Sequence, residues 1–118
     1  LEVQVDKDIK NSLSYLSKDG YIILHDCNPP TEFHQRENYE VNGSYPTWNG
    51  TTWKSYAKIR MTNENLSLYC VNCDWGIGII SRGKTKLFPL KKNLEFEFLE
   101  KNRKELLNLI SVKKFLAL

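Results

Sequence analysis

Hydrophobic positions change their spacing along the chain, and each change predicts a different element. Between residues 3 and 17, apolar side chains recur every three or four positions, as in an amphipathic helix. Lys18-Asp19-Gly20 ends this helix, with Gly20 suited to a left-handed cap. Residues 21–24 are then apolar without polar alternation, which is typical of a strand buried on both faces.

A long irregular segment follows this strand, between residues 28 and 50, and it is rich in proline and glycine. Loops of this length inside a compact domain usually carry function or are mobile. A helix is expected from about residue 51 to 61, with Asn49 or Thr51 as its amino-terminal cap.

The second half of the chain predicts a β-hairpin and a last helix. Residues 66–72 alternate in the way of a strand, and residues 77–80 form a second one after a turn. An apolar stripe predicts a helix over about residues 95–110.

This order of elements predicts an α/β fold with a small mixed sheet, in which one parallel-type strand and an antiparallel hairpin are flanked by helices. The 118 residues are enough for a single domain, which we expect to span residues 1–118, with a helical extension over residues 89–118. No apolar run approaches the roughly 20 residues that cross a membrane, so no membrane contact is expected.

The net charge of +3 is unevenly distributed, because ten basic and four acidic residues follow position 81. A basic tail can attract nucleic acid. Here, however, Lys101, Arg103 and Lys104 alternate with glutamates, which favours the solvated face of a helix. Nucleic-acid binding is therefore the weaker interpretation.

The chain has three cysteines, an odd number, and its amino end carries charged residues within an amphipathic pattern instead of a secretory signal. We therefore expect reduced thiols in a cytoplasmic protein. Cys70 and Cys73 have the spacing of a metal or redox pair, but a structural zinc usually needs a second such pair. The two side chains are also expected to face opposite sides of a strand, so we expect no metal site there.

Candidate chemistry lies where the first strand ends, at His25 and Asp26. Ligands of open α/β sheets bind at the carboxyl edge of the strands. His25 is a plausible general base because the pKa of histidine lies near working pH. The alternative is that His25 and Asp26 only cap the loop and hydrogen-bond Asn28 and neighbouring amides, which we favour for the isolated chain.

Aromatic side chains are frequent in and around the long loop. Tyr39, Tyr45 and Trp48 are the candidates for stacking on an acceptor molecule, together with Asn28 as a polar contact. Trp53 and Trp75 are expected to pack in the core instead.

The order of elements and three motifs resemble the carboxyl-terminal half of a class I S-adenosylmethionine-dependent methyltransferase, and the resemblance covers most of residues 3–88. The motifs are Gly20-Tyr21-Ile22-Ile23-Leu24-His25-Asp26-Cys27, Trp48-Asn49-Gly50-Thr51-Thr52-Trp53-Lys54 and Asp74-Trp75-Gly76-Ile77-Gly78. They are most similar to a bacterial branch often found beside polysaccharide and glycosyltransferase functions. The resemblance implies a partial Rossmann-like fold, with residues 21–24 as the fifth strand and the hairpin as the sixth and seventh.

Half of what this family needs is absent from the sequence. The family holds its cofactor on a glycine-rich loop after the first strand, and an acidic residue at the end of the second strand binds the ribose. Gly76-Ile77-Gly78 is the only close glycine pair, and it belongs to a predicted hairpin. Some members of the family bind a metal through an aspartate at the position that corresponds to Asp26 and through an amide side chain next to it. In this chain, the residue next to Asp26 is Cys27, which has no amide side chain. We therefore expect neither S-adenosylmethionine nor a metal to bind this chain alone.

The resemblance thus implies the acceptor-side fragment of a methyltransferase that acts on a small molecule or a sugar, inactive by itself. His25 and Asp26 would be catalytic in the complete enzyme, and whether this chain is itself an enzyme stays open. The alternative is a non-catalytic half-domain that serves oligomerisation or partner binding. In the parent sheet the fifth strand is paired on its other side as well, so the bare edge of residues 21–24 predicts a homo-oligomer or a loosened fold.

Overall fold

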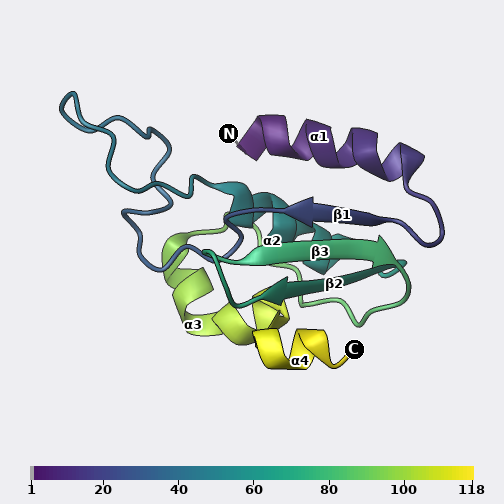
Figure 1. Cartoon of the computed structure of the whole chain (residues 1–118). Coiled ribbons are helices and arrows are strands. Elements are labelled where there is room, and N and C mark those ends of the chain that lie inside the picture. Colours follow the sequence, from purple (N-terminus) through teal and green to yellow (C-terminus); the bar gives the residue numbers. More distant parts are fainter. Residues whose placement is uncertain (1) are drawn as a thin grey trace.

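The computed structural model describes residues 2–118 as a mixed α/β domain (Figure 1). Its four strands form one sheet in the order β1-β3-β2-β4. The strands are β1 (Tyr21–Leu24), β2 (Leu66–Val71), β3 (Ile77–Arg82) and β4 (Leu109–Ile110), and the helices are α1 (Glu2–Tyr15), α2 (Thr52–Thr62), α3 (Phe96–Leu107) and α4 (Val112–Leu116).

The predicted hairpin is confirmed, because β2 and β3 pair antiparallel from Leu66↔Arg82 to Val71↔Ile77. β1 lies on the other side of β3, also antiparallel, with Ile23 opposite Ile79. Since β1 and β2 both run antiparallel to β3, they run in the same direction. Their carboxyl ends therefore lie at the same edge of the sheet. The predicted mixed sheet flanked by helices is confirmed, but its parallel pair is β2 with β4, and residues 21–24, expected to be the parallel-type strand, pair antiparallel with β3.

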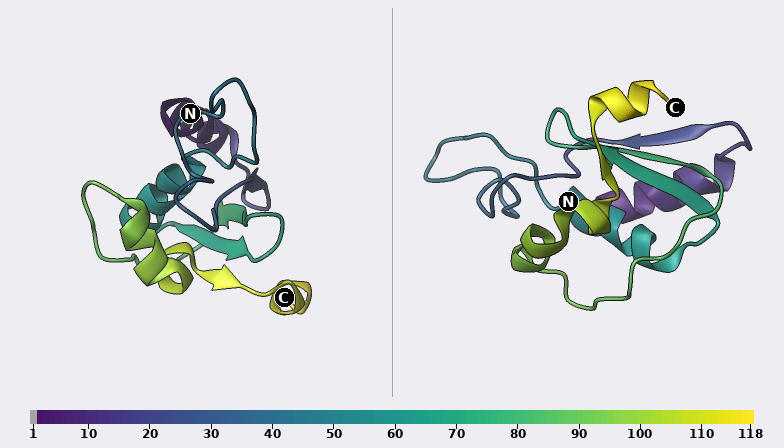
Figure 2. Two further views of the ribbon diagram at one scale, coloured as in Figure 1. Left: turned by 90° about the vertical axis from the view of Figure 1, so that its left-hand side faces the viewer. Right: turned by 90° about the horizontal axis from the view of Figure 1, so that it is seen from below.

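The main core lies between one face of the sheet and helices α1, α2 and α3 (Figure 2). Trp53 and Tyr56 of α2 are fully buried there, as are Leu99 and Leu106 of α3. The hydroxyl of Tyr56 donates a hydrogen bond of 2.6 Å to the carbonyl of Leu107, where α3 ends. The expected core position of Trp53 is confirmed.

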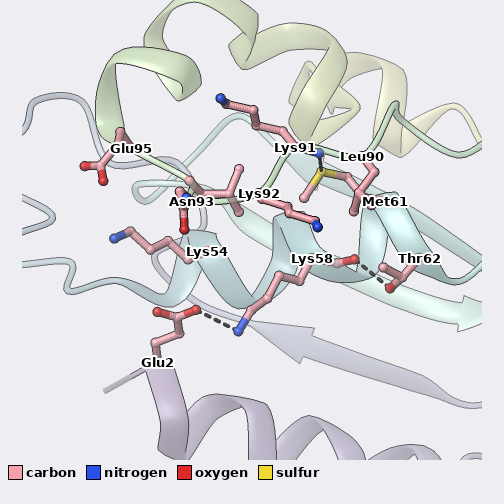
Figure 3. Close-up of a pocket in the computed structure, with 11 residues that line it drawn as sticks. Glu2, Lys54, Lys58, Met61, Thr62, Leu90, Lys91, Lys92, Asn93 and Glu95 are labelled. Atoms are coloured by element: carbon pink, nitrogen blue, oxygen red, sulfur yellow. Dashed lines mark hydrogen bonds and ion pairs between the residues drawn. The ribbon is translucent and has the colours of Figure 1, made fainter.

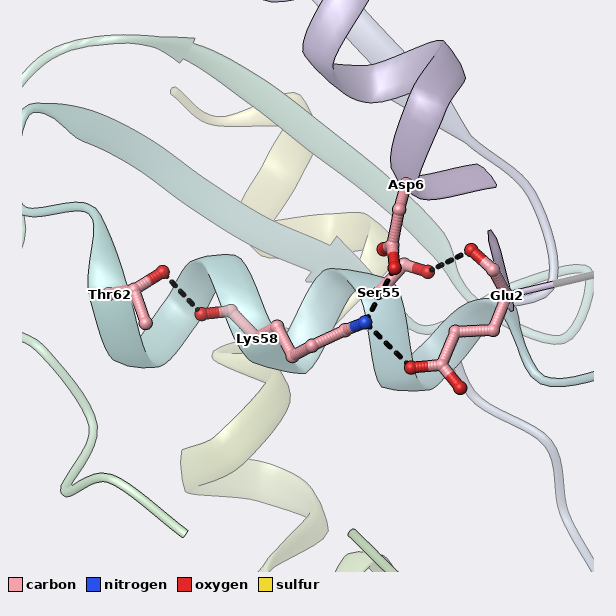
Figure 4. A network of polar contacts seen from close by, with 5 residues as sticks. All are labelled: Glu2, Asp6, Ser55, Lys58 and Thr62. Carbon is pink, nitrogen blue, oxygen red and sulfur yellow. Dashed lines mark hydrogen bonds and ion pairs between the residues drawn. The ribbon is translucent and has the colours of Figure 1, made fainter. Parts of the chain in front are cut away.

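Helix α1 is attached to α2 by a small polar network (Figure 4). Lys58 of α2 bridges two carboxylates of α1, with distances of 2.7 Å to Glu2 and 2.6 Å to Asp6. Ser55 donates a hydrogen bond to the carbonyl of Glu2. Because this network is partly exposed, its contribution to stability is modest, and the burial of Ile9 adds the apolar part of the contact.

The second face of the sheet is only partly covered, by a small cluster around Val71, Ile79 and Ile110 with Phe115 of α4 packed against it. Tyr21 and Ile23 lie on this face beyond α4 and are 67% and 59% exposed. The prediction that residues 21–24 are buried on both faces is therefore wrong. An uninterrupted apolar run does not reveal that a strand lies at an edge where one face has no helix over it.

The last helix ends earlier than its apolar stripe suggests. α3 stops at Leu107 because Asn108 adopts a left-handed backbone with φ of 50°, and its side chain donates to the carbonyl of Leu68. The chain then runs parallel to β2 as β4, with Ile110 opposite Val71. The region 89–118, expected to be a helical extension, thus adds a strand to the sheet.

Of the two cap predictions, the one for Gly20 is wrong. Gly20 does not have a positive φ, and its N–H donates to the carbonyl of Ser17. Thr51, one of the two residues predicted to cap the next helix, is the N-cap of α2, although its side chain makes no capping hydrogen bond, and Asn49 bonds Asp26 instead.

Candidate functional site

Asp26 marks the exit of β1 with an unusual backbone. Its φ is 61°, in the left-handed region that Asp and Asn adopt more readily than other non-glycine residues, and five further non-glycine residues of the described chain share this region. Burial raises the pKa of its carboxyl group, while the hydrogen bond from Asn49 and the nearby His25 act in the opposite direction. His25 itself is exposed and makes no hydrogen bond through its ring within residues 2–118. The two predicted catalytic residues are thus side by side, one half-buried and one open to solvent.

Asn49, predicted from the sequence as a helix cap and as part of a family-like motif, completes this part of the site. Its side chain is 2% exposed, and its Nδ2 donates a 3.1 Å hydrogen bond to Oδ1 of Asp26. Its backbone N–H donates to the carbonyl of His34, which fixes the base of the long loop. The amide oxygen Oδ1 is buried and finds no hydrogen-bond partner among residues 2–118. Buried acceptors in native proteins are normally satisfied, so this unpaired oxygen is an exception at the exit of β1.

The raised pKa of Asp26 predicts how an Asp26→Asn variant responds to pH. Burial disfavours the carboxylate in the folded state, so ionisation of Asp26 above its ordinary pKa of 3.8 costs folding free energy. The asparagine keeps an acceptor for Asn49 and carries no charge. We expect the variant to be more stable than the native chain at pH 7, with the gain lost below about pH 4. Urea unfolding at both pH values measures this, and a gain that persists at pH 3 would contradict it.

The aromatic residues predicted to contact an acceptor gather on the long loop, which projects from the body of the molecule (Figure 1). Tyr39 and Tyr45 stack with ring centroids 5.0 Å apart, and Tyr39 lies 5.5 Å from Trp48. Tyr39 and Tyr45 are more than half exposed. Trp48 directly precedes Asn49 in the chain, so the aromatic cluster is connected to the Asp26–Asn49 pair through neighbouring residues.

Arg36 holds this loop in shape. Its guanidinium donates to the carbonyls of Tyr39, Pro46 and Thr47 at 2.9–3.0 Å, and the indole of Trp48 donates back to the Arg36 carbonyl. One arginine thus joins both arms of the loop, a role that no sequence motif indicated.

Asn28, the fourth residue predicted to bind an acceptor, lies in a different group. Its backbone N–H donates to the carbonyl of Trp75 at 2.7 Å, and its side chain accepts from Arg103 of α3. Arg103 is half-buried, so its expected place on a solvated face is wrong. Trp75, expected in the core, is 47% exposed because the turn before β3 directs it outward with φ of 59°.

A hollow of about 870 Å³ lies elsewhere, between α2 and the segment before α3 (Figure 3). Its walls carry four lysines and two glutamates but none of the residues predicted to be functional, and neither histidine nor cysteine lines it. We therefore place the candidate site at the carboxyl edge of the sheet, where the unusual backbone and the unpaired amide oxygen occur.

The cysteines are free thiols with different surroundings. Cys70 is buried in the main core and Cys73 packs against the smaller cluster, which confirms that they face opposite sides of the sheet. Among residues 2–118, no group of three His, Cys, Asp or Glu side chains is arranged to hold a metal ion.

These surroundings predict selective thiol labelling. Burial raises the pKa of Cys27 strongly and that of Cys70 to about 12, so both remain protonated and shielded near neutral pH. Only the half-buried Cys73 is expected to react with a thiol reagent such as dithiobisnitrobenzoate in the folded chain at pH 8. All three should react in 6 M guanidinium, and rapid labelling of Cys27 in the folded chain would contradict the burial.

Comparisons with known proteins assign no family. A scan against family models, a search of curated proteins and a search of solved structures each found no match. Within the part of the chain that the structure describes, no helix has the length and apolar character needed to cross a membrane.

Proposed function

We propose that this chain is the acceptor-side half of an S-adenosylmethionine-dependent methyltransferase with a Rossmann-like sheet, acting on a hydroxyl group of a small molecule or a sugar. The observation that carries the proposal is the exit of β1, where Asp26 has a left-handed backbone and contacts the buried Asn49. The hairpin beside β1 supports it because it agrees with what the resemblance implies, and the aromatic loop next to Asn49 supports it because aromatic side chains can stack on a sugar.

The chemistry that these residues can supply is binding and deprotonation of the acceptor. His25 is exposed and accepts the hydroxyl proton as general base. Asp26 orients that hydroxyl or stabilises the histidine cation that forms, and the buried Asn49 holds the carboxylate of Asp26 in place through its hydrogen bond. Tyr39 and Tyr45 provide exposed aromatic surface for a sugar ring.

Residues 2–118 do not fit S-adenosylmethionine. Space around the only close glycine pair is already filled, because a Cβ at Gly76 would lie 2.4 Å from that of Asn28, and one at Gly78 would lie 2.9 Å from both Cys27 and Tyr56. A glycine-rich cradle needs open space for the ligand against the backbone. We therefore assign the binding of the cofactor to another part of a complete enzyme.

The test compares this chain with the longest protein that its gene encodes. Calorimetry is expected to show no S-adenosylmethionine binding to residues 1–118, and binding with methyl transfer for the longer protein. His25→Ala in that protein should lower kcat by about 10²–10⁴, as expected for loss of a general base. His34→Gln is the matched control, because its ring contacts Thr31 within the loop. Full activity of the His25 variant, or no transfer to any hydroxyl acceptor, would refute the proposal.

The free edge of β1 favours a second candidate function, self-association. Within residues 2–118, β1 pairs only with β3, and an open groove of about 640 Å³ separates its other side from the end of α1. Bare edges invite pairing with another strand unless charge or proline blocks it, and β1 has neither. A two-fold pairing centred on Ile22 would place Lys18 opposite Asp26 of the second copy and Tyr21 opposite Ile23.

Sedimentation of the native chain and an Ile23→Lys variant tests this second function. The native chain is expected to dimerise and the variant to stay monomeric, because a lysine on the edge strand blocks sheet extension. Leu90→Lys is the control, since Leu90 is equally exposed but far from β1 in the sequence and outside the sheet. A native chain that stays monomeric at high concentration would rule out self-association.

A further inference from the structure

A hollow of about 440 Å³ lies at the carboxyl edge of the sheet, between the exit of β1, the turn after β2 and helix α3. Its lining residues are Asn28, Pro30, Asn72, Cys73, Asp74, Trp75 and Arg103. We propose that this hollow binds a small molecule that carries a carboxylate, with Arg103 as the ionic contact and Trp75 as the apolar wall.

The hollow has a fixed framework. The N–H groups of Cys27 and Asn28 donate to the carbonyls of Gly76 and Trp75 at 3.0 and 2.7 Å, which joins the β1 exit to the turn. Arg103 adds the third wall, because it donates to the side chain of Asn28 and to the carbonyl of Pro29. Three segments far apart in the sequence thus meet around one cavity.

Only part of the Arg103 guanidinium is engaged by these bonds. A guanidinium has five N–H groups, and both protein contacts use Nη1. The Nε and Nη2 groups have no hydrogen-bond partner among residues 2–118, and no carboxylate within that range forms an ion pair with this side chain. Nε–H and one Nη2–H point along the same edge of the guanidinium, which is the geometry that binds a carboxylate through two hydrogen bonds.

The electrostatics favour an anion with a single charge. Burial lowers the pKa of Arg103 and the nearby Glu100 acts in the opposite direction, so the desolvation of the guanidinium is only partly compensated within the described chain. A bound carboxylate would compensate it. Asp74 also lines the hollow and would repel a phosphate dianion more strongly than a carboxylate. The volume is suitable for a molecule of monosaccharide size.

We assign this carboxylate to the acceptor of the proposed function, a step that rests on that function, and the acceptor would then be a sugar acid. The hollow and the Asp26–Asn49 pair flank the same β1 exit, since Asn28 is two residues from Asp26. A carboxylate held by Arg103 would fix the orientation of a ring whose hydroxyl faces His25. The indole of Trp75, 47% exposed at the rim, offers its face to the C–H groups of such a ring.

The test is titration of the ¹⁵N-labelled chain with D-glucuronate, with D-glucose as the neutral match. Glucuronate is expected to shift the indole N–H of Trp75 and the amides of residues 73–76 in a saturable way, and glucose is expected to leave them unchanged. Equal shifts with the two sugars, or none with glucuronate, would overturn the carboxylate site.

Variants separate ligand binding from a purely structural role of Arg103. Arg103→Gln should weaken glucuronate binding at least tenfold, while Lys101→Gln on the exposed side of α3 should leave it unchanged. Asp74→Asn should tighten binding by removing a repulsive charge, and it leaves the framework bonds intact, so it remains informative if Arg103→Gln does not fold. An Asp74→Asn variant with unchanged or weaker affinity would overturn the proposal. Glucuronate binding by a protein that transfers no methyl group would retain this site and reject the proposed function instead.

Discussion

Replacing Gly76 by alanine is expected to lower the free energy of unfolding by about 2–5 kcal/mol, through backbone strain and a steric clash together. Gly76 has a φ of 89°, in the region that favours glycine. An added Cβ would lie 2.4 Å from Cβ and 2.5 Å from the backbone nitrogen of Asn28, so the β1 exit would have to move. Urea unfolding followed by tryptophan fluorescence measures the loss.

Gly43→Ala is the matched control for this prediction. Gly43 also has a positive φ, 78°, but nothing lies within 4 Å of an added Cβ. Gly43→Ala should therefore lower the free energy of unfolding by about 1–2 kcal/mol, from backbone strain alone. The difference in free energy of unfolding between the two variants measures the cost of the steric clash between residue 76 and Asn28. Equal losses would show that this contact contributes nothing, and would weaken the case for a fixed hollow beside Arg103.

Local sequence patterns predicted the elements that depend on local spacing. The bounds of β1 are those expected, and the hairpin of β2 and β3 appears where alternation and turn residues indicated it. The short β4 could not be predicted, because its two residues carry no period. It exists because Asn108 reverses the chain and bonds the carbonyl of Leu68, which depends on tertiary packing.

The candidate site was predicted only in part, for a related reason. His25 and Asp26 were found because they follow an apolar run directly. Their partners come from far along the chain: Asn49 is 23 residues from Asp26, and Arg103 is 75 residues from Asn28. A single sequence contains no signal for such pairs. The exposure of Ile23 was missed for the same reason, since hydrophobicity does not show which face of a strand lacks a cover.

Replacing Arg60 by methionine is expected to cost about 3 kcal/mol, because charged hydrogen bonds to buried carbonyls are lost together. Arg60 of α2 is 7% exposed and forms no ion pair within residues 2–118. Its guanidinium donates to the carbonyls of Glu105, Leu106 and Lys86 at 2.9, 3.1 and 3.3 Å. Two of these carbonyls belong to the last turn of α3, where a cation also compensates the helix dipole. Methionine fills similar space but leaves these carbonyls without a donor.

Arg82→Met is the control for Arg60→Met, because Arg82 is exposed and makes one hydrogen bond, of 2.9 Å, to the carbonyl of Leu13. The free energy of unfolding of Arg82→Met should lie within about 0.5 kcal/mol of that of the native chain, as for most surface substitutions. Hydrogen exchange adds a local measurement. In the Arg60 variant, the amides of Cys70 and Asn72, which donate to the carbonyls of Asn108 and Ile110, should lose protection before the β1–β3 pairs do. If Arg60→Met is no more destabilising than Arg82→Met, the end of α3 and β4 do not depend on the buried arginine.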